Sequence, residues 1–445
     1  MELTLLGTGA PSGLPRPHCP CAACATARGD QARAATSLLV DGVLLLDLTP
    51  GAALAAARAG HTLTGVRQVL LTHPHDGPAV ELPAGLPPAG RVADGRVLTL
   101  LSGHRVRAVA MDAPGTGYEV TAPGGERLLY LPPGGAPAGV SAGVFAPAGD
   151  SSGKPSGVSA DTGRTAPSTS SGASASSASS APSTALASPA KAPYDMVAAD
   201  VTGRPDAVAR LRAAGAIGVS TDIVAVHLDH DVPPGAELDR RLAAAGARAV
   251  PDGTTLTVGA YHPVPDVPRR TLVTGGARSG KSWEAERRLE AFPGVLYVAT
   301  GGTREGDPEW DARVRTHRDR RPGSWRTAET CDLVPLLAAE GPPLLIDCLS
   351  LWLTDAMDRV NAWDDAAWAG GGEKALRERM SELAEAVRGT RRTVVAVTNE
   401  VGSGVVPATA SGRRFRDELG RLNSAVAAEC ERVLLVVAGQ AVTLR

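Results

Sequence analysis

The C-terminal part of the chain alternates between short apolar runs and stretches with the periodicity of amphipathic helices. The apolar runs are rich in Val, Ile and Leu and cover residues 271–274, 295–299, 343–347, 393–398 and 432–437. Helical periodicity is clearest over residues 374–388 and 413–432. Continuous apolar strands that alternate with helices predict an α/β fold, in which a mainly parallel sheet is covered by helices on both faces.

The N-terminal part has strand-like runs on both sides of a long segment of low complexity. These runs lie at residues 37–47, 68–72, 106–111 and 126–131 before it, and at 194–199, 223–227 and 254–258 after it. Residues 149–192 are Ser, Ala, Pro, Gly and Thr with almost no large apolar side chain, so they cannot bury enough surface to offset the entropy of ordering. We therefore expect a disordered insertion within one N-terminal domain, residues 1–260.

A proline-rich stretch, residues 261–270, is expected to link this domain to a second one at 271–445. A chain of 445 residues is long enough for two or three domains. Its net charge is −2 and its Lys and Arg are scattered, so no basic face for nucleic acid is expected. No apolar run is long enough to span a membrane, and the first residues lack the charged start of a signal peptide. We expect a cytoplasmic protein.

A glycine-rich loop follows the first apolar run of the second domain and precedes a helix-like stretch. It has the pattern G-x-x-x-x-G-K-S and consists of Gly275, Gly276, Ala277, Arg278, Ser279, Gly280, Lys281 and Ser282. Glycines let backbone N–H groups turn inward around phosphate oxygens, and the following helix presents the positive end of its dipole. The lysine can reach the β- and γ-phosphates, and the last hydroxyl can hold Mg²⁺. This strand–loop–helix context predicts a nucleoside triphosphate site rather than a turn that binds nothing.

Polar residues follow three other predicted strands of this domain. Thr300, Gly301 and Gly302 follow one strand, Asp347 ends the next, and residues 398–402 follow the third. The carboxyl ends of parallel strands meet at one edge of a sheet, where ligands bind. An acid at a single strand end could be a helix cap, but three polar strand ends beside a phosphate loop indicate a binding crevice.

A histidine, His317, stands among arginines in the segment 313–321. On its own it would be read as a solvated residue on a helix face. Beside a triphosphate site it predicts more, because a neutral imidazole is a good nucleophile toward an α-phosphate. Neighbouring guanidiniums can stabilise the charge that develops.

Several motifs of the C-terminal part, taken together and in this order, resemble one known family. They are GGARSGKS at 275–282, YVAT at 297–300, the Arg/His segment at 313–321, WRTAE at 325–329, TNEVGSGVVP at 398–407, RFRD at 414–417 and RLN at 421–423. The chain from about residue 270 to residue 445 is similar to the bifunctional adenosylcobinamide kinase / adenosylcobinamide-phosphate guanylyltransferases of cobalamin biosynthesis, which have a P-loop NTPase-like fold.

That resemblance implies two reactions on a small-molecule corrinoid substrate. Adenosylcobinamide is first phosphorylated by ATP or GTP, between which the sequence does not choose. A histidine then attacks the α-phosphate of GTP, and the covalent GMP passes to the corrinoid phosphate to give adenosylcobinamide-GDP. The resemblance assigns the nucleophile to His317; some relatives carry two adjacent histidines here, which leaves the register open by one residue, and Thr316 cannot act in this way. It also suggests a homo-oligomer, a trimer.

By the same resemblance, further residues line the nucleotide site. Besides residues 275–282 they are Thr300, Gly301, Gly302, Arg318, Asp319, Arg320 and Arg321, with Glu329 and Asp347 as polar contacts to the nucleotide or to Mg²⁺.

The N-terminal part resembles the metallo-β-lactamase fold, an αββα sandwich, and within it the phosphodiesterase branch. The likeness rests on the first strand, on residues 37–47 and on the run that leads into His73 and His75. The family's remaining ligands to two catalytic metals are mostly replaced, and only His227 is left of the last ones. We therefore expect a non-catalytic domain. The alternatives are a retained metal-dependent phosphodiesterase and a docking module for another protein.

A cluster of three cysteines after the first strand is a candidate metal site. Cys19, Cys21 and Cys24 form a C-x-C-x-x-C pattern, which in a cytosolic chain is more often a metal site than a disulfide. In the phosphodiesterase branch such cysteines hold zinc together with a histidine, a position matched here by His230, with His18 as a spare candidate. Three thiolates and one imidazole close a tetrahedral shell, so the implied zinc is structural.

Overall fold

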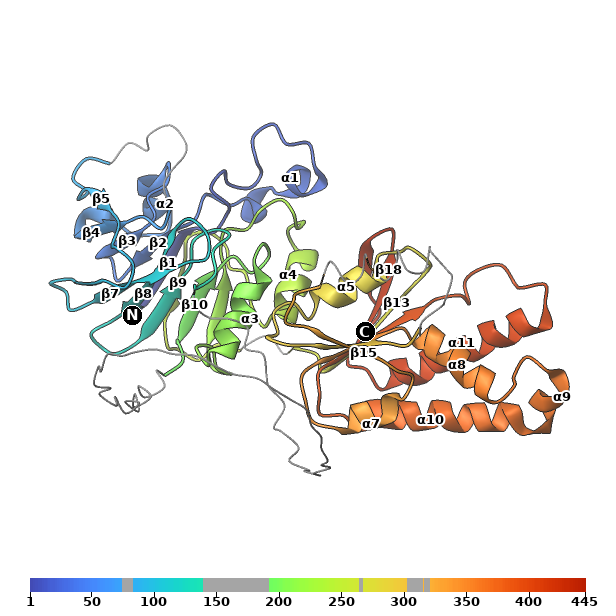
Figure 1. The fold of residues 1–445 in the computed structure, drawn as a ribbon. Coiled ribbons are helices and arrows are strands. Elements are labelled where there is room, and N and C mark those ends of the chain that lie inside the picture. Colours follow the sequence, from blue (N-terminus) through green and yellow to red (C-terminus); the bar gives the residue numbers. More distant parts are fainter. Residues whose placement is uncertain (74–82, 139–191, 264–266, 302–314, 316–320) are drawn as a thin grey trace, which may run out of the picture. The chain divides into compact units, whose positions relative to one another are not determined.

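The computed structural model describes the chain except for residues 74–82, 139–191, 264–266, 302–314 and 316–320, and it contains three β-sheets (Figure 1). The predicted insertion, apart from Ala192, lies outside the described residues. The parts of the chain before residue 144 and after residue 192 form one compact unit. Within the described part of the chain, no helix is both long and apolar enough to cross a membrane.

The first sheet has six strands in the order β12-β1-β2-β3-β4-β5. These strands are β1 (Glu2–Gly7), β2 (Ser37–Val40), β3 (Leu44–Leu46), β4 (Gln68–Leu70), β5 (Ala89–Gly90) and β12 (Thr254–Thr257). The single apolar run expected at residues 37–47 is therefore a hairpin. Asp41 and Gly42 turn the chain with positive φ angles of 45° and 67°, a conformation that Asp and Gly adopt more readily than other residues.

The second sheet also has six strands, in the order β11-β10-β9-β8-β7-β6. Its strands are β6 (Val97–Thr99), β7 (Arg105–Ala110), β8 (Thr116–Thr121), β9 (Arg127–Tyr130), β10 (Met196–Ala199) and β11 (Asp222–Ala225). Strands β6 to β9 are antiparallel, whereas β9, β10 and β11 run parallel. Strands from both sides of the low-complexity segment thus pair in one sheet.

These two sheets pack face to face. Side chains from both, such as Leu5 and Leu38 from the first and Val120 and Leu128 from the second, share one fully buried core. The outer face of the first sheet is covered by α2 (Ala52–Arg58) and that of the second by α3 (Pro205–Ala213) and α4 (Ala236–Ala244). The N-terminal part is therefore an αββα sandwich, as expected. Three short helical segments complete it: α1 (Ala22–Thr26), η1 (Gly29–Gln31) and η2 (Leu63–Gly65).

The third sheet has seven strands in the order β15-β14-β16-β17-β13-β18-β19. They are β13 (Arg270–Gly275), β14 (Leu296–Ala299), β15 (Arg326–Glu329), β16 (Leu344–Asp347), β17 (Val394–Asn399), β18 (Arg432–Val437) and β19 (Gln440–Thr443). Six of the strands are parallel, and the edge strand β19 returns antiparallel to β18. The mainly parallel sheet predicted from the apolar runs is confirmed.

Helices cover both faces of this sheet. The helix α5 (Lys281–Arg287) packs Ala285 against Val273 and Val397 on one face. The other face carries α7 (Leu333–Ala338), α8 (Leu349–Arg359), α10 (Glu373–Gly389) and α11 (Ala410–Ala428), with α9 (Asp365–Ala367) and η3 (Trp368–Gly372) leading into α10. The last predicted helix was placed too far along the chain. It ends at Ala428, because residues from 432 onward pair with β13 as a strand.

Candidate functional site

The glycine-rich loop leaves the sheet from an interior strand. β13 lies between β17 and β18, its last residue is Gly275, and α5 begins at Lys281. A Cβ atom on Gly275 would lie 2.5 Å from the carbonyl oxygen of Val436 and 2.6 Å from Oγ of Ser279, so no larger residue fits. Gly280 has a φ of 99°, which side-chain-bearing residues rarely adopt. Backbone geometry therefore accounts for two of the glycines of the motif.

The lysine of the loop is folded back over the loop. Lys281 is 6% exposed, and its Nζ donates a hydrogen bond to the carbonyl oxygen of Gly276, 3.2 Å away. The ammonium group therefore lies beside the backbone that would surround a phosphate. Ser282, the last residue of the motif, is half-buried in the first turn of α5.

The predicted polar strand ends come together at the same edge of the sheet. Asn399 is level with Gly275 on the neighbouring strand, and Asp347 ends the strand beyond it. The Tyr297 hydroxyl donates to Oδ2 of Asp347 at 2.9 Å, and the guanidinium of Arg321 lies over the Tyr297 ring, 3.2 Å from its centre. Burial and the Asp347 carboxylate both raise the pKa of Tyr297, so its phenol stays protonated and donates.

Two other predicted site residues, Thr300 and Glu329, differ in burial. Thr300 is buried, and its hydroxyl donates to the carbonyl oxygen of Cys348 and accepts from the Cys348 N–H, at 2.7 and 2.9 Å. This hydroxyl therefore ties the ends of β14 and β16 together. Glu329 is exposed at the end of β15, level with Ala299. Tyr297 was not among the predicted site residues, although the motif YVAT places it three residues before Thr300.

Five of the predicted site residues of this part lie outside the described residues. They are Gly302, His317, Arg318, Asp319 and Arg320.

The candidate metal ligands of the N-terminal part do converge. Nδ1 of His230 lies 3.2, 3.6 and 3.7 Å from the Sγ atoms of Cys19, Cys21 and Cys24. All four ligand atoms lie within 4.8 Å of one another. Zinc bound tetrahedrally, with about 2.3 Å to sulfur and about 2.0 Å to nitrogen, would separate S and N by about 3.5 Å. The four side chains, drawn together from both ends of the N-terminal part, therefore fit a zinc ion.

The protonation of these thiols also bears on a metal. The backbone N–H of Cys24 donates to Sγ of Cys21 and lowers the pKa of that thiol to about 7. Burial raises the pKa of Cys24 to about 11. A bound cation would remove this difference, because coordination deprotonates a thiol.

Two of the histidines predicted as remnants of a catalytic metal centre, His73 and His227, lie within the described residues. Asp47 is fully buried and accepts a hydrogen bond from the hydroxyl of Thr72. The same hydroxyl is hydrogen-bonded to Nδ1 of His73, 2.7 Å away. His227 stacks on the ring of Tyr130, and its Nε2 donates to the carbonyl oxygen of Leu131 at 3.1 Å. Burial lowers the pKa of His227 to about 4, so this imidazole is neutral at physiological pH. His75 lies outside the described residues.

Comparison with known proteins places the C-terminal part among curated relatives. Residues 271–444 match the family model of "cobinamide kinase / cobinamide phosphate guanyltransferase". The bifunctional adenosylcobalamin biosynthesis protein CobU of Salmonella typhimurium is 40% identical over 184 residues, which are 39% of this chain and 98% of that protein. The corresponding protein CobP of Pseudomonas aeruginosa is 42% identical over 181 residues, 40% of this chain and 97% of that protein.

Among solved structures, a diphosphatase from the PhnP family is similar at 16% identity with a TM-score of 0.36, over 60% of this chain and 99% of that one.

Proposed function

The chain belongs, through residues 271–444, to the cobinamide kinase / cobinamide phosphate guanyltransferase family, and from this premise we propose that it converts adenosylcobinamide to adenosylcobinamide-GDP. One observation carries the proposal. The family match spans the whole C-terminal sheet, and its phosphate loop lies on an interior strand with Lys281 folded over it. The same loop would serve both steps of the conversion.

In the first step, the loop holds the triphosphate of ATP or GTP. Backbone N–H groups of residues 275–280 and the ammonium of Lys281 bind phosphate oxygens. The hydroxyl of Ser282 and the carboxylate of Asp347 would hold Mg²⁺, which would neutralise charge on the phosphates. The Tyr297 hydroxyl, bonded to Oδ2 of Asp347, fixes the orientation of that carboxylate. The hydroxyl of adenosylcobinamide then attacks the γ-phosphorus, and the nucleoside diphosphate leaves.

In the second step, we propose His317 as the nucleophile. A ring nitrogen of His317 attacks the α-phosphorus of GTP, a P–N bond forms, and the bond to pyrophosphate breaks. A phosphate oxygen of adenosylcobinamide phosphate then attacks the same phosphorus and releases the imidazole. Arginines 318, 320 and 321 supply positive charge where negative charge develops. Arg321, fixed over the Tyr297 ring, is the described member of this group.

We propose that the N-terminal part binds one structural zinc and has no hydrolytic centre. The proposal of zinc rests on the convergence of Cys19, Cys21, Cys24 and His230. These ligands leave no open position for water, which a catalytic zinc needs. The absence of a hydrolytic role is supported by the Asp47 carboxylate, whose hydrogen-bond donors are protein groups, and by the engagement of His227 with Leu131.

A direct assay tests the enzymatic proposal. The purified full-length chain is incubated with adenosylcobinamide, Mg²⁺ and either ATP or GTP, and the products are identified by mass spectrometry. We expect adenosylcobinamide phosphate to form with ATP, with GTP or with both. Adenosylcobinamide-GDP should form only when GTP is present. Lys281→Ala should lower the rate of the first step by roughly 10²–10³-fold, the usual cost of removing one charge-stabilising donor. Lys374→Ala, on the exposed surface of α10, is the matched control and should keep full activity. If the unaltered chain forms neither of the two products, the proposal is refuted.

A further inference from the structure

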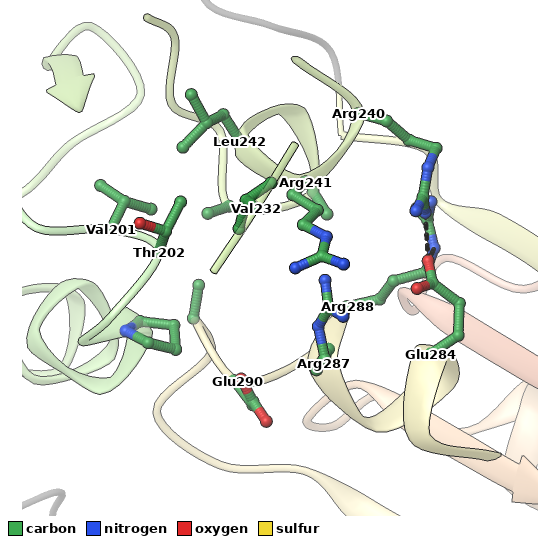
Figure 2. A pocket seen from close by; sticks show the side chains of 14 residues that line it. Val201, Thr202, Val232, Arg240, Arg241, Leu242, Glu284, Arg287, Arg288 and Glu290 are labelled. Atoms are coloured by element: carbon green, nitrogen blue, oxygen red, sulfur yellow. Dashed lines mark hydrogen bonds and ion pairs between the residues drawn. The ribbon is translucent and has the colours of Figure 1, made fainter. Parts of the chain in front are cut away.

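An arginine-lined cavity lies where α4 meets the C-terminal end of α5 (Figure 2). Its volume is about 60 Å³. Four guanidinium groups line it, those of Arg240, Arg241, Arg287 and Arg288, together with two carboxylates, those of Glu284 and Glu290. None of these residues belongs to the phosphate loop or to the cysteine cluster.

One side of the cavity is a network of ion pairs. Arg240 pairs with Glu284 of α5 and with Glu237 of its own helix. Nε of Arg288 also donates to Glu284, at 3.2 Å, so this carboxylate is shared between two guanidiniums. Glu237 in turn pairs with Arg241. Counting Glu237, four arginines face three carboxylates, which leaves a net positive charge.

The other side has donors without acceptors. Nη1 of Arg287 and Nη2 of Arg288 are buried, and neither has a hydrogen-bond partner within the described part of the chain. The side chain of Arg288 is only 6% exposed. Leaving a charged donor buried and without an acceptor destabilises the folded protein. Two such donors beside one small cavity therefore indicate that the cavity has an acceptor as its natural occupant.

The charges around the cavity favour an anionic occupant. Figure 2 shows the guanidinium groups of Arg241 and Arg287 directed toward one another. Burial, and next the charge of Arg241, lower the pKa of Arg287. Burial raises the pKa of Glu290, which disfavours its negative charge. An anion between the arginines would raise the pKa of Arg287 back toward its usual value.

We infer that this cavity is a binding site for a phosphate group. At about 10–15 Å³ for each water, its volume holds roughly four to six waters, which is room for a small tetrahedral oxyanion. Such a dianion has enough acceptor oxygens for the free Nη groups, and guanidinium forks bind phosphate in pairs of parallel hydrogen bonds. The site is separate from the phosphate loop, although α5 joins the two. A phosphate bound at the C-terminal end of α5 would fix the helix whose first residue is Lys281.

Two sources supply such a group, free phosphate and pyrophosphate. The test measures binding of each to the full-length chain by calorimetry and by the shift of its unfolding temperature. Because the phosphate loop also binds phosphate, the measurement is made on Lys281→Ala. We expect this variant to bind one of the two anions, and the tighter one identifies the source.

Adding Arg287→Gln to Lys281→Ala should weaken that binding at least tenfold and leave the anion-free protein equally or more stable, because an unpaired buried charge is removed. Arg58→Gln, an exposed arginine of α2, is the matched control and should change neither quantity. Loss of all phosphate and pyrophosphate binding in Lys281→Ala alone would overturn the inference, as would equal binding with and without Arg287.

A second measurement needs no variant. Crystals of the unaltered chain soaked in selenate, a tetrahedral dianion, should give an anomalous peak within hydrogen-bonding distance of Arg287 and Arg288. A peak at the phosphate loop and none in the cavity would also overturn the inference.

Discussion

Tyr130 donates its phenolic hydrogen to Oδ2 of Asp47 across the interior of the N-terminal sandwich, at a distance of 2.6 Å. Tyr130 ends β9 of the second sheet, and Asp47 follows β3 of the first, so the bond joins the two sheets. The N–H and the hydroxyl of Thr72 donate to the same carboxylate, both at 2.7 Å. Three donors satisfy a charge that is fully buried, which makes Asp47 a structural group of the sandwich.

Replacement of Tyr130 by Phe should therefore destabilise the N-terminal part. A hydrogen bond to a charged group contributes about 1.5–3 kcal/mol, and the variant leaves Asp47 with one donor fewer. Tyr118→Phe is the matched control, because this buried phenol donates to a neutral acceptor, the carbonyl oxygen of Leu71, and should cost about 0.5–1.5 kcal/mol.

The loss of stability in each variant is measured by urea unfolding, with hydrogen exchange of peptides from β8 and β9 as the signal. Tryptophan fluorescence would not serve, since all six tryptophans lie between residues 283 and 368. Equal losses in the two variants would contradict the role assigned to Asp47.

Removal of one cysteine ligand should remove the zinc. We expect about one zinc per chain in the purified protein by elemental mass spectrometry, as a closed four-ligand site implies. Cys24→Ser should reduce this content close to zero and lower the stability of the N-terminal part, because the binding free energy of a structural zinc contributes to folding. Cys331→Ser is the control, since this thiol donates to the carbonyl oxygen of Thr300 and lies outside the cluster. A chain purified without zinc, or full zinc in Cys24→Ser, would refute the site.

Local patterns explain why much of the fold and one site could be predicted from the sequence. Apolar runs in the second half are strands because every residue of β16 before Asp347 is buried between helices. The phosphate loop could be predicted because its backbone requires glycine at two positions. A side chain would clash at Gly275, and Gly280 has a positive φ angle. The αββα layers, and the ligand role that we propose for His230, were predicted through resemblance to known families and not through the local pattern.

Contacts between distant residues could not be predicted in the same way. The bond of Tyr297 to Asp347 joins two neighbouring strands, and nothing in either run marks the partner. The same is true of Arg240 and Glu284, which lie in separate helices and enclose part of the arginine-lined cavity. The helix end at Ala428 also depends on a distant partner, because the pairing of Arg432 with Thr271 decides where the strand begins.

Gly275→Ala should disturb the phosphate loop even without nucleotide. The added Cβ would lie 2.5 Å from a backbone oxygen of β18, a clash that only a shift of the backbone can relieve. We expect a loss of about 1–3 kcal/mol, typical of overpacking, by urea unfolding followed through tryptophan fluorescence. At Gly276 an added Cβ has nothing within 4 Å, so Gly276→Ala should change stability by less than about 0.5 kcal/mol. Similar stabilities of the two variants would show that the loop tolerates a side chain at the end of β13.

His317→Ala should abolish the covalent nucleotide adduct and spare the kinase step. Only the second reaction of the proposed sequence needs an imidazole nucleophile, whereas the first needs the phosphate loop. The chain is incubated with GTP labelled at the α-phosphate, denatured and tested for label that stays bound in alkali and is released in acid, as a P–N bond requires. His262→Ala is the control, because His262 is the histidine nearest to His317 in the sequence and lies before β13. We expect label on the unaltered chain and on His262→Ala, none on His317→Ala, and formation of adenosylcobinamide phosphate by all three. An undiminished adduct on His317→Ala would assign the nucleophile to another residue, and loss of phosphorylation as well would place His317 in the site shared by both reactions.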